Sequence, residues 1–300
     1  MKANPLKGAS VALVTPFNRD GTLDEGALRE LVDWQIEQGI DGIVAAGTTG
    51  EAATLTGEEQ LRLIEVVIER AGGRCPVVAG TGSNSTARSV ELTAEAERLG
   101  CAAALVVGPY YNKPTQEGLY RHFRAVAEAT RLPIIVYNVP GRTASNIAAE
   151  TVLRLAALEN VAAVKEASGD LAQIMRILRE RPEGFLVLSG DDALTLPILA
   201  LGGDGVISVV ANECPAEFRR MVWACLEGRW EEAREIHYRL LPLMEVNFIE
   251  SSPIPVKAAL AMMGRIREEY RLPLVPMSDA NRSRMRTLLE ALGLPVREAE

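Results

Sequence analysis

The chain has 300 residues, of which 48% are hydrophobic and 24% are charged, and its formal net charge at pH 7 is −8. This composition is typical of a globular protein with a large core, and the length permits a single barrel domain. The acidic balance argues against a nucleic-acid-binding surface, which needs clustered positive charge, and no apolar run is long enough to span a bilayer.

Short apolar, β-branched runs alternate with longer amphipathic segments along most of the chain. The candidate strands cover residues 10–15, 42–47, 76–80, 103–108, 133–138, 161–166, 185–190 and 205–209. Apolar strands separated by helical patterns indicate a parallel sheet covered on both faces. Eight such units, at intervals of roughly 25–30 residues, predict an α/β protein of the (β/α)8 TIM-barrel class. A doubly wound sheet is the alternative, but PFNRDG after the first strand is not the GxGxxG turn that such a sheet uses.

From about residue 227 the strand pattern stops and three helical patterns follow. They cover residues 227–247, 252–264 and 278–293. Their period predicts a C-terminal three-helix appendage, packed on the barrel or used in assembly. We therefore expect a barrel over residues 1–226 and a helical region over residues 227–300.

Cysteine and histidine usage excludes several kinds of site. The four cysteines form no CxxC pair, so we expect free thiols, a reducing compartment and no zinc site. The only two histidines, His122 and His237, lie in helical patterns and are expected on helix surfaces. Serine-type triads and histidine-built metal sites are therefore not expected. The first residues do not resemble a secretory leader, which favours the cytoplasm.

In a barrel of this class, reactive groups lie at the C-terminal ends of the strands. Those ends are rich in hydroxyl groups and glycines and include one arginine and one lysine. The residues of interest there are Thr48, Thr49, Tyr110, Tyr111, Tyr137, Arg142, Lys165, Gly190 and Ile207.

Lys165 ends the apolar run VAAVK. Strand alternation places it on the same face as Val161 and Ala163. If that face lines the barrel, the small side chain of Ala163 leaves room for the lysine, and desolvation lowers the pKa of an amine that then attacks carbonyl groups. The alternative, which the run alone favours, is a lysine that reaches solvent or pairs with Glu166 or Asp170.

Three neighbouring features also have more than one reading. Tyr137 ends the adjacent strand, where its phenol either shuttles protons or caps a layer of the barrel. The segment GTTGE is a carboxylate nest, a phosphate loop without the Walker lysine, or a helix entry in which Thr56 caps a helix that starts near Glu58 and Glu59. Arg142 follows a Pro-Gly turn and is suited to a bidentate grip on a carboxylate or to a surface salt bridge.

Six motifs together resemble one family. GTTGEAATLT, GPYYNKPTQEGLYRHF, YNVPGRT, VKEASGD, LSGDD and GVISVVAN occur in the order seen in the dihydrodipicolinate synthase family of class I pyruvate-dependent aldolases. The resemblance covers nearly the whole chain, including PIPVKAAL near its C-terminus. It implies Schiff-base condensation of pyruvate with aspartate semialdehyde, for diaminopimelate and lysine biosynthesis. It also implies a homotetramer built from tight dimers and no metal or organic cofactor.

The resemblance assigns catalytic roles to four residues. Lys165 forms the Schiff base with pyruvate, and Tyr137, Thr48 and Tyr111 form a proton relay, with Tyr111 reaching the neighbouring subunit's site. Sugar-acid aldolases, such as N-acetylneuraminate lyase and 2-keto-3-deoxygluconate aldolase, share the scaffold and would also use Lys165 and Tyr137. A non-catalytic barrel that serves as a binding protein is a further alternative, which the intact set argues against.

Substrate-binding roles follow from the same resemblance. Thr48 and Thr49 hold the pyruvate carboxylate, and Arg142 holds the carboxylate of aspartate semialdehyde. Gly190 and Ile207 offer backbone carbonyls near the site. Arg142 within YNVPGRT resembles the synthase pattern rather than that of the sugar-acid aldolases.

Regulation is expected to differ from that of part of the family. Lysine-inhibited members resemble one another in carrying histidines after the TTGE loop and a glutamate after the GTG-Asn stretch. Those positions are Gly57, Gln60 and Arg88 here, although Asn84 and Tyr110 remain. An arginine in place of the acidic partner repels the ammonium group of lysine, so we predict weak or absent feedback inhibition.

Overall fold

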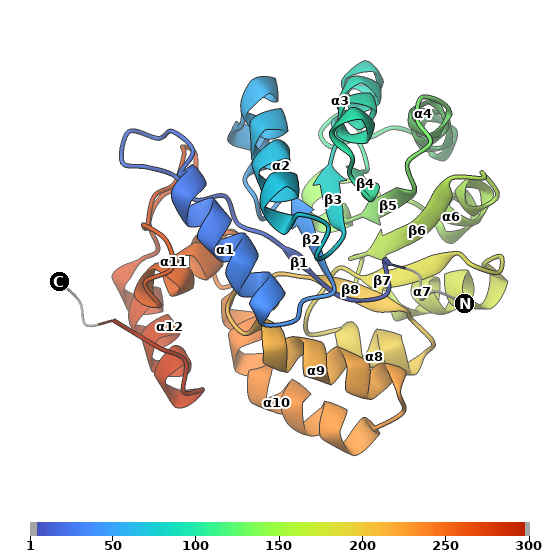
Figure 1. Cartoon of the computed structure of the whole chain (residues 1–300). Coiled ribbons are helices and arrows are strands. Elements are labelled where there is room, and N and C mark those ends of the chain that lie inside the picture. Colours follow the sequence, from blue (N-terminus) through green and yellow to red (C-terminus); the bar gives the residue numbers. More distant parts are fainter. Residues whose placement is uncertain (1–4, 298–300) are drawn as a thin grey trace.

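The computed structural model describes residues 5–297, in which parallel strands form a closed barrel with helices around it (Figure 1). The strands are β1 (Gly8–Ala12), β2 (Gly42–Ala45), β3 (Val77–Gly80), β4 (Ala103–Val107), β5 (Ile134–Asn138), β6 (Val161–Glu166), β7 (Leu186–Ser189) and β8 (Gly205–Ser208). β1 pairs with both β2 and β8, which closes the ring. The predicted (β/α)8 class is confirmed and the doubly wound alternative is wrong.

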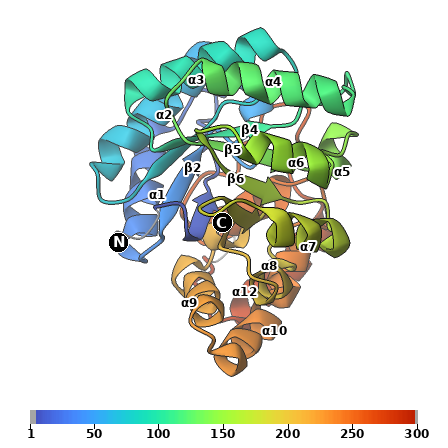
Figure 2. The ribbon, with the colours of Figure 1, turned by 90° about the vertical axis from the view of Figure 1, so that its right-hand side faces the viewer.

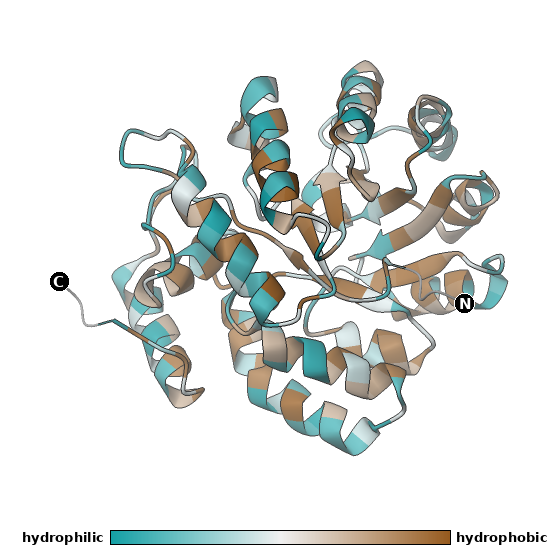
Figure 3. Ribbon diagram, in the orientation of Figure 1, coloured by the Kyte–Doolittle hydropathy of each residue, from teal (hydrophilic) through white to brown (hydrophobic). Residues whose placement is uncertain are grey.

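Helices follow the strands and cover the outside of the barrel (Figure 2). Hydrophobic and hydrophilic residues alternate along the helices (Figure 3), and the buried hydrophobic ones belong to one core cluster with outward-facing residues of the strands. The helices are α1 (Glu25–Glu37), η1 (Ala52–Thr54), α2 (Gly57–Ala71), α3 (Thr86–Leu99), α4 (Gln116–Glu128), α5 (Pro140–Thr143), α6 (Ala149–Ala156), α7 (Leu171–Glu180), α8 (Thr195–Ala200), η2 (Val210–Asn212), α9 (Pro215–Leu226), α10 (Trp230–Val246), α11 (Ile254–Met262) and α12 (Asp279–Ala291). Within residues 5–297, none of them combines the length and the apolar character needed to cross a membrane.

The start of α2, a few residues after the GTTGE segment, is fixed by a helix cap. The Thr56 hydroxyl accepts a hydrogen bond from the Glu59 N–H at 3.2 Å, and the Glu59 carboxylate accepts one from the Thr56 N–H at 2.9 Å. This capping box satisfies backbone donors that the first turn of a helix leaves free. The predicted role of Thr56 as a helix cap is confirmed.

The core has two layers, because alternate residues of each strand face the barrel interior or the surrounding helices. The inner layer includes Ile135, Ala163 and Ile207, whereas their strand neighbours pack against helices. The predicted face of Val161 is wrong. Pairing between β5 and β6 shifts between Ile134 and Ile135, so that Val161 joins the outer layer while Ala163 remains in the inner one.

The helical patterns predicted after residue 227 are confirmed as α10, α11 and α12. α10 packs on α9, and α12 packs on α10 and α11. α11 and α12 are on the left in Figure 1, and the Arg265 guanidinium, just after α11, lies 4.2 Å from the centre of the Trp34 ring in α1. The boundary between residues 226 and 227 remains a prediction.

The histidine expectation is wrong, since His122 and His237 are both buried. Each lies on the buried face of its helix. A periodic pattern does not say whether a single polar residue at the edge of the apolar face is buried or exposed. His122 Nδ1 lies 3.0 Å from the Thr86 hydroxyl, and burial lowers the pKa of His122 to about 4. The cysteines are free thiols as expected; Cys75 is partly buried and the other three are buried.

Candidate active site

The side chain of Lys165 projects from the C-terminal end of β6 into the mouth of the barrel and is only 6% exposed. The methyl group of Ala163 lies one layer below it, in the inner core. Gly190, just after β7, lies beside the lysine: a Cβ added there would be 3.0 Å from Lys165 Cε. Two small residues thus leave room for a long side chain inside the barrel.

Burial lowers the pKa of the Lys165 amine to about 8. The negative charge of Asp192 opposes this shift, and the positive charge of Arg142 adds to it. About one-tenth of the amine is therefore neutral at pH 7, compared with well under one part in a thousand for an ordinary lysine. A neutral amine is the form that attacks a carbonyl carbon.

Tyr137 lies directly opposite Lys165 in the pairing of β5 with β6. The lysine Nζ is 4.3 Å from the centre of the tyrosine ring. The Tyr137 phenol shares a hydrogen bond with the Thr48 side chain, and burial raises the pKa of Tyr137 to about 12, against the opposing effects of Arg142 and Thr48. The phenol therefore stays protonated and is available to give and regain a proton beside the amine.

The turn over residues 47–51 places Thr48 and Thr49 next to this pair. The N–H groups of Gly50 and Glu51 donate back to the carbonyls of Gly47 and Thr48, each at 3.1 Å. Within residues 5–297, the N–H groups of Thr48 and Thr49 donate to no protein acceptor, so both are free for an anion. The carboxylate-nest reading therefore fits the geometry, alongside the confirmed helix cap further on.

Arg142, in α5, lines the same space as Thr48 and Tyr137. Its Nη2 donates to the Ser252 carbonyl oxygen at 3.4 Å, and Arg142 as a whole is an exposed residue. No carboxylate lies within ion-pair distance of it among the described residues. The surface-salt-bridge alternative is therefore not what the structure shows.

Two adjoining cavities are lined by these residues. The larger has a volume of about 400 Å³, and the smaller, of about 30 Å³, reaches Lys165 and Gly190. Gly47, Thr48, Tyr137 and Arg142 line both of them. The two cavities therefore adjoin at these four residues, and Lys165 forms part of the wall of the smaller one.

Two predicted site residues are not at the cavities. Tyr111, after β4, is 88% exposed, has a φ of +71° and lines neither cavity. Ile207 in β8 is buried in the inner core, and Val209 lines the smaller cavity instead. Their predicted roles are compatible with this placement, through a second subunit for Tyr111 and through the backbone for Ile207, but they stay predictions.

Several residues at the site were given no role in the sequence reading. The Asp192 carboxylate accepts hydrogen bonds from the N–H groups of Val209 and Val210, at 3.0 and 2.8 Å, and burial raises its pKa to about 6. Phe248 and Ser252 line the smaller cavity from the segment after α10. The doubled aspartate of LSGDD is a local signal for Asp192. No local signal marks the other two, which the fold brings to the barrel mouth from the C-terminal region.

The ionisable groups of the site are an amine, a phenol, a carboxyl and a guanidinium. Among residues 5–297, no group of three or more His, Cys, Asp or Glu side chains is placed to hold a metal ion. The arrangement suits covalent chemistry on a small keto acid, with an amine as nucleophile, hydroxyl groups for proton transfer and two positions for carboxylates.

Comparison with known proteins gives a consistent result. A model of the dihydrodipicolinate synthetase family matches residues 5–292. A 4-hydroxy-tetrahydrodipicolinate synthase of Chlorobium phaeobacteroides (strain DSM 266 / SMG 266 / 2430) is 53% identical over 295 residues, which cover 98% of this chain and 100% of the relative. The crystal structure of dihydrodipicolinate synthase from Aquifex aeolicus is similar with a TM-score of 0.96 and 48% identity, over 98% of this chain and 100% of that one. The chloride-inhibited enzyme from Acinetobacter baumannii, solved in complex with pyruvate, has a TM-score of 0.95 and 44% identity, over 96% and 99% of the two chains.

Proposed function

Because the chain belongs to the dihydrodipicolinate synthetase family, we propose that it is the lyase that condenses pyruvate with aspartate semialdehyde to 4-hydroxy-tetrahydrodipicolinate. The buried amine of Lys165, partly neutral at pH 7 and reached from a cavity lined by hydroxyl groups, is the observation that carries this proposal. The pathway is then that of diaminopimelate and lysine.

The first half of the reaction builds a nucleophile on the enzyme. Neutral Lys165 Nζ attacks the keto carbon of pyruvate, and loss of water from the carbinolamine gives an iminium ion. Loss of a methyl proton, with its electron pair delocalised to the iminium nitrogen, gives an enamine. The free N–H groups and hydroxyls of Thr48 and Thr49 are suited to hold the pyruvate carboxylate meanwhile.

The second half forms the carbon–carbon bond and releases the lysine. The enamine carbon attacks the aldehyde carbon of aspartate semialdehyde, and the resulting alkoxide takes a proton from the relay of Tyr137, Thr48 and Tyr111. The amino group of the condensed product then attacks the carbon–nitrogen double bond, closes the ring and displaces Lys165. In sum, one pyruvate and one aspartate semialdehyde give one ring product and one water. The covalent bond between pyruvate and Lys165 takes the place of a cofactor in this scheme.

Arg142 is the proposed partner of the semialdehyde carboxylate. Arg142 is an exposed residue that lines the larger cavity. A planar fork of donors recognises a carboxylate with two parallel hydrogen bonds. This assignment is what separates the proposal from a sugar-acid aldolase, whose second substrate has a different polar end.

Tyr111 requires a second copy of the chain to take part in the relay. Its exposed phenol and its unusual positive φ support a role outside its own subunit, since strained exposed residues persist where they serve a function. We therefore include in the proposal a homotetramer of tight dimers and a cytoplasmic location.

Borohydride trapping tests the covalent step. Incubation with pyruvate and borohydride should add the mass of one reduced pyruvate per chain, on the peptide that contains Lys165. Lys257, the other lysine that is buried among residues 5–297, should stay unmodified, because its side chain has no exposed surface. Lys165→Ala should abolish the adduct without changing the circular dichroism spectrum. An adduct on another lysine, or none in the presence of pyruvate, would refute the proposal, and rates with sugar-acid substrates above those with the semialdehyde would favour the rival class.

A further inference from the structure

Lys257 is a cationic side chain without solvent contact that the proposed chemistry does not use. It lies in α11, and its ammonium forms an ion pair with the Glu51 carboxylate, 206 residues earlier in the chain. Both side chains are fully buried. The ammonium also lies 4.4 Å from the centre of the Phe17 ring and 5.1 Å from that of Tyr270, so aromatic faces take the place of water around it.

Glu51 is the last residue of the turn that presents Thr48 and Thr49. Its φ is +54°, in the left-handed region that a residue with a side chain rarely adopts. Its N–H donates to the Thr48 carbonyl at 3.1 Å, while its carboxylate reaches Lys257 and, at 3.5 Å, the Arg271 N–H. One end of the residue thus holds the turn and the other end is held by the C-terminal region.

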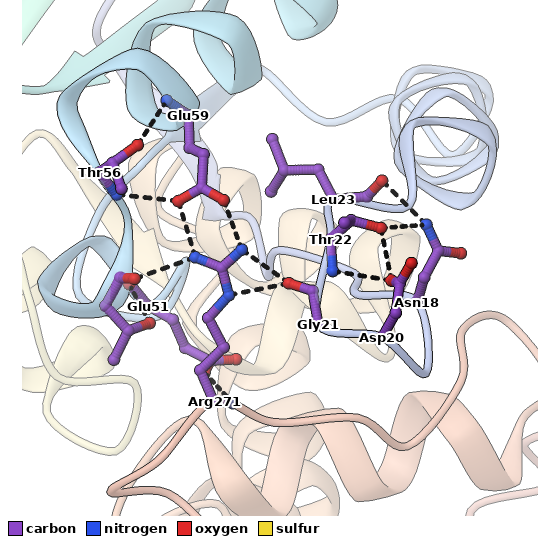
Figure 4. A network of polar contacts seen from close by, with 10 residues as sticks. Asn18, Asp20, Gly21, Thr22, Leu23, Glu51, Thr56, Glu59 and Arg271 are labelled. Carbon is purple, nitrogen blue, oxygen red and sulfur yellow. Dashed lines mark hydrogen bonds and ion pairs between the residues drawn. The ribbon is translucent and has the colours of Figure 1, made fainter.

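A second cation fixes the chain just beyond the turn. The Arg271 guanidinium donates to both oxygens of Glu59, at 2.6 and 2.8 Å, and to the carbonyls of Thr54 and Gly21, at 3.0 and 2.7 Å (Figure 4). These contacts hold η1 and the start of α2. The guanidinium contacts do not involve the Glu51 side chain, to which Arg271 donates only its backbone N–H, so they remain possible when the Lys257–Glu51 ion pair is removed.

The segment that leads into α11 also borders the site itself. Phe248 and Ser252 line the cavity around Lys165, and the Ser252 carbonyl lies 3.4 Å from Arg142 Nη2. Residues 248–257 therefore contact both proposed carboxylate sites. Ser252 contacts Arg142 at one site, and Lys257 contacts Glu51, in the turn that forms the other. The helical region after residue 227 takes part in the barrel mouth.

A fully buried ion pair such as Lys257–Glu51 contributes little net free energy to folding, so stability alone does not explain it. Desolvation of the two charges offsets much of their attraction, and well-packed apolar residues often stabilise such a position as well or better. An ion pair does, however, fix the position of the Glu51 side chain. The turn at Glu51 has a positive φ, and fixing that side chain keeps the free N–H groups of the turn pointed at a ligand.

We propose that Lys257 is a positioning residue that acts through Glu51 to hold Thr48 and Thr49 in the geometry that receives the pyruvate carboxylate. The inference rests on the proposed function for the identity of the ligand. The mechanical part of the inference, that the Lys257 ammonium in α11 immobilises the turn of residues 47–51, is independent of the proposed function.

Kinetics of paired variants test the role. Lys257→Met and Glu51→Gln should each raise KM for pyruvate at least tenfold, while KM for aspartate semialdehyde changes less than threefold. Their combination should be no worse than the more damaging single variant, because both act through one contact. Arg181→Met is the control: it removes a partly buried ion pair with Asp204, before β8 at the opposite end of the barrel, and should lower the melting temperature without changing KM for pyruvate.

Hydrogen exchange tests the mechanical part without pyruvate. Amide exchange in the peptide spanning residues 47–52 should be faster in Lys257→Met than in the wild type, and unchanged in Arg181→Met. A folded Lys257→Met variant with wild-type exchange, or with KM for pyruvate within twofold of wild type, would overturn the inference. If Lys257→Met does not fold, Glu51→Gln, which keeps an acceptor for the ammonium, replaces it. Wild-type exchange in that variant, or KM for pyruvate within twofold of wild type, would then overturn the inference. Failure of the wild type to trap pyruvate would instead refute the proposed function, and exchange would still decide the positioning role.

Discussion

The pH dependence of pyruvate capture follows from the two charges that act on Lys165 in opposite directions. Asp192 favours the ammonium form, and Arg142 favours the neutral amine. With a pKa of about 8, the neutral fraction is about one-half at pH 8, one-tenth at pH 7 and one-hundredth at pH 6. We therefore expect kcat/KM for pyruvate to rise about tenfold per pH unit from pH 6 to pH 7 and to level off above pH 8, since this parameter reports the pKa of the free enzyme.

Removal of each charge should move that profile in a defined direction. Asp192→Asn keeps an oxygen that accepts from the N–H groups of Val209 and Val210 but loses the negative charge, so the pKa of Lys165 falls and the profile shifts to lower pH. A shift of one pKa unit, about 1.4 kcal/mol, would raise the neutral fraction at pH 7 about fivefold. Arg142→Gln removes the positive charge and should shift the profile to higher pH.

The assay is kcat/KM for pyruvate between pH 5.5 and about 10, at constant ionic strength because screening weakens both effects. Below about pH 6 the wild-type slope should flatten, because protonation of Asp192, whose pKa is raised to about 6 by burial, removes the charge that favours the ammonium. A wild-type midpoint near the usual lysine pKa, or two variants that shift in the same direction, would contradict the electrostatic account.

Three further predictions concern the neighbours of the amine, regulation and assembly. Gly190→Ala places a Cβ 2.8 Å from Ala167 Cβ and 3.0 Å from Lys165 Cε, so it should lower kcat about 10- to 100-fold and also lower the melting temperature; an unchanged kcat would show that the lysine has room to move. Sub-millimolar lysine should not inhibit, because the Arg88 guanidinium occupies the space beside Gly57 and lines the larger cavity; half-maximal inhibition in that range would refute this. Sedimentation should give a homotetramer, and Tyr111→Phe should lower kcat without lowering pyruvate trapping; a fully active monomer would exclude the relay across subunits.

Local pattern was sufficient for the elements of the barrel and for most of its cavity. β6 begins and ends where the run VAAVKE predicts, because a strand buried on both faces is nearly continuous in apolar residues. The hydroxyls, the arginine and the lysine follow strand ends, where parallel strands bring them to one face. Thr48, Thr49, Tyr137, Arg142, Lys165 and Gly190, which line the cavities, were found in this way.

The register between strands and the burial of single polar residues on helices could not be predicted from the local sequence pattern. The face of Val161 was wrong because a shift in pairing with β5 depends on the neighbouring strand and not on β6. His122 was wrong because an amphipathic pattern does not say whether a single polar residue at its border is buried with a partner or exposed.

The amino-acid sequence by itself determined the class of barrel, the capped start of α2 and the lysine at the end of β6, because each depends on residues close together in the chain. Only the tertiary structure decided that the lysine amine is desolvated, with a pKa lowered to about 8, because this depends on strands and loops that enclose it from all sides. It also decided that Lys257 meets Glu51 across 206 positions, since the energy of a buried charge depends on what surrounds it in space.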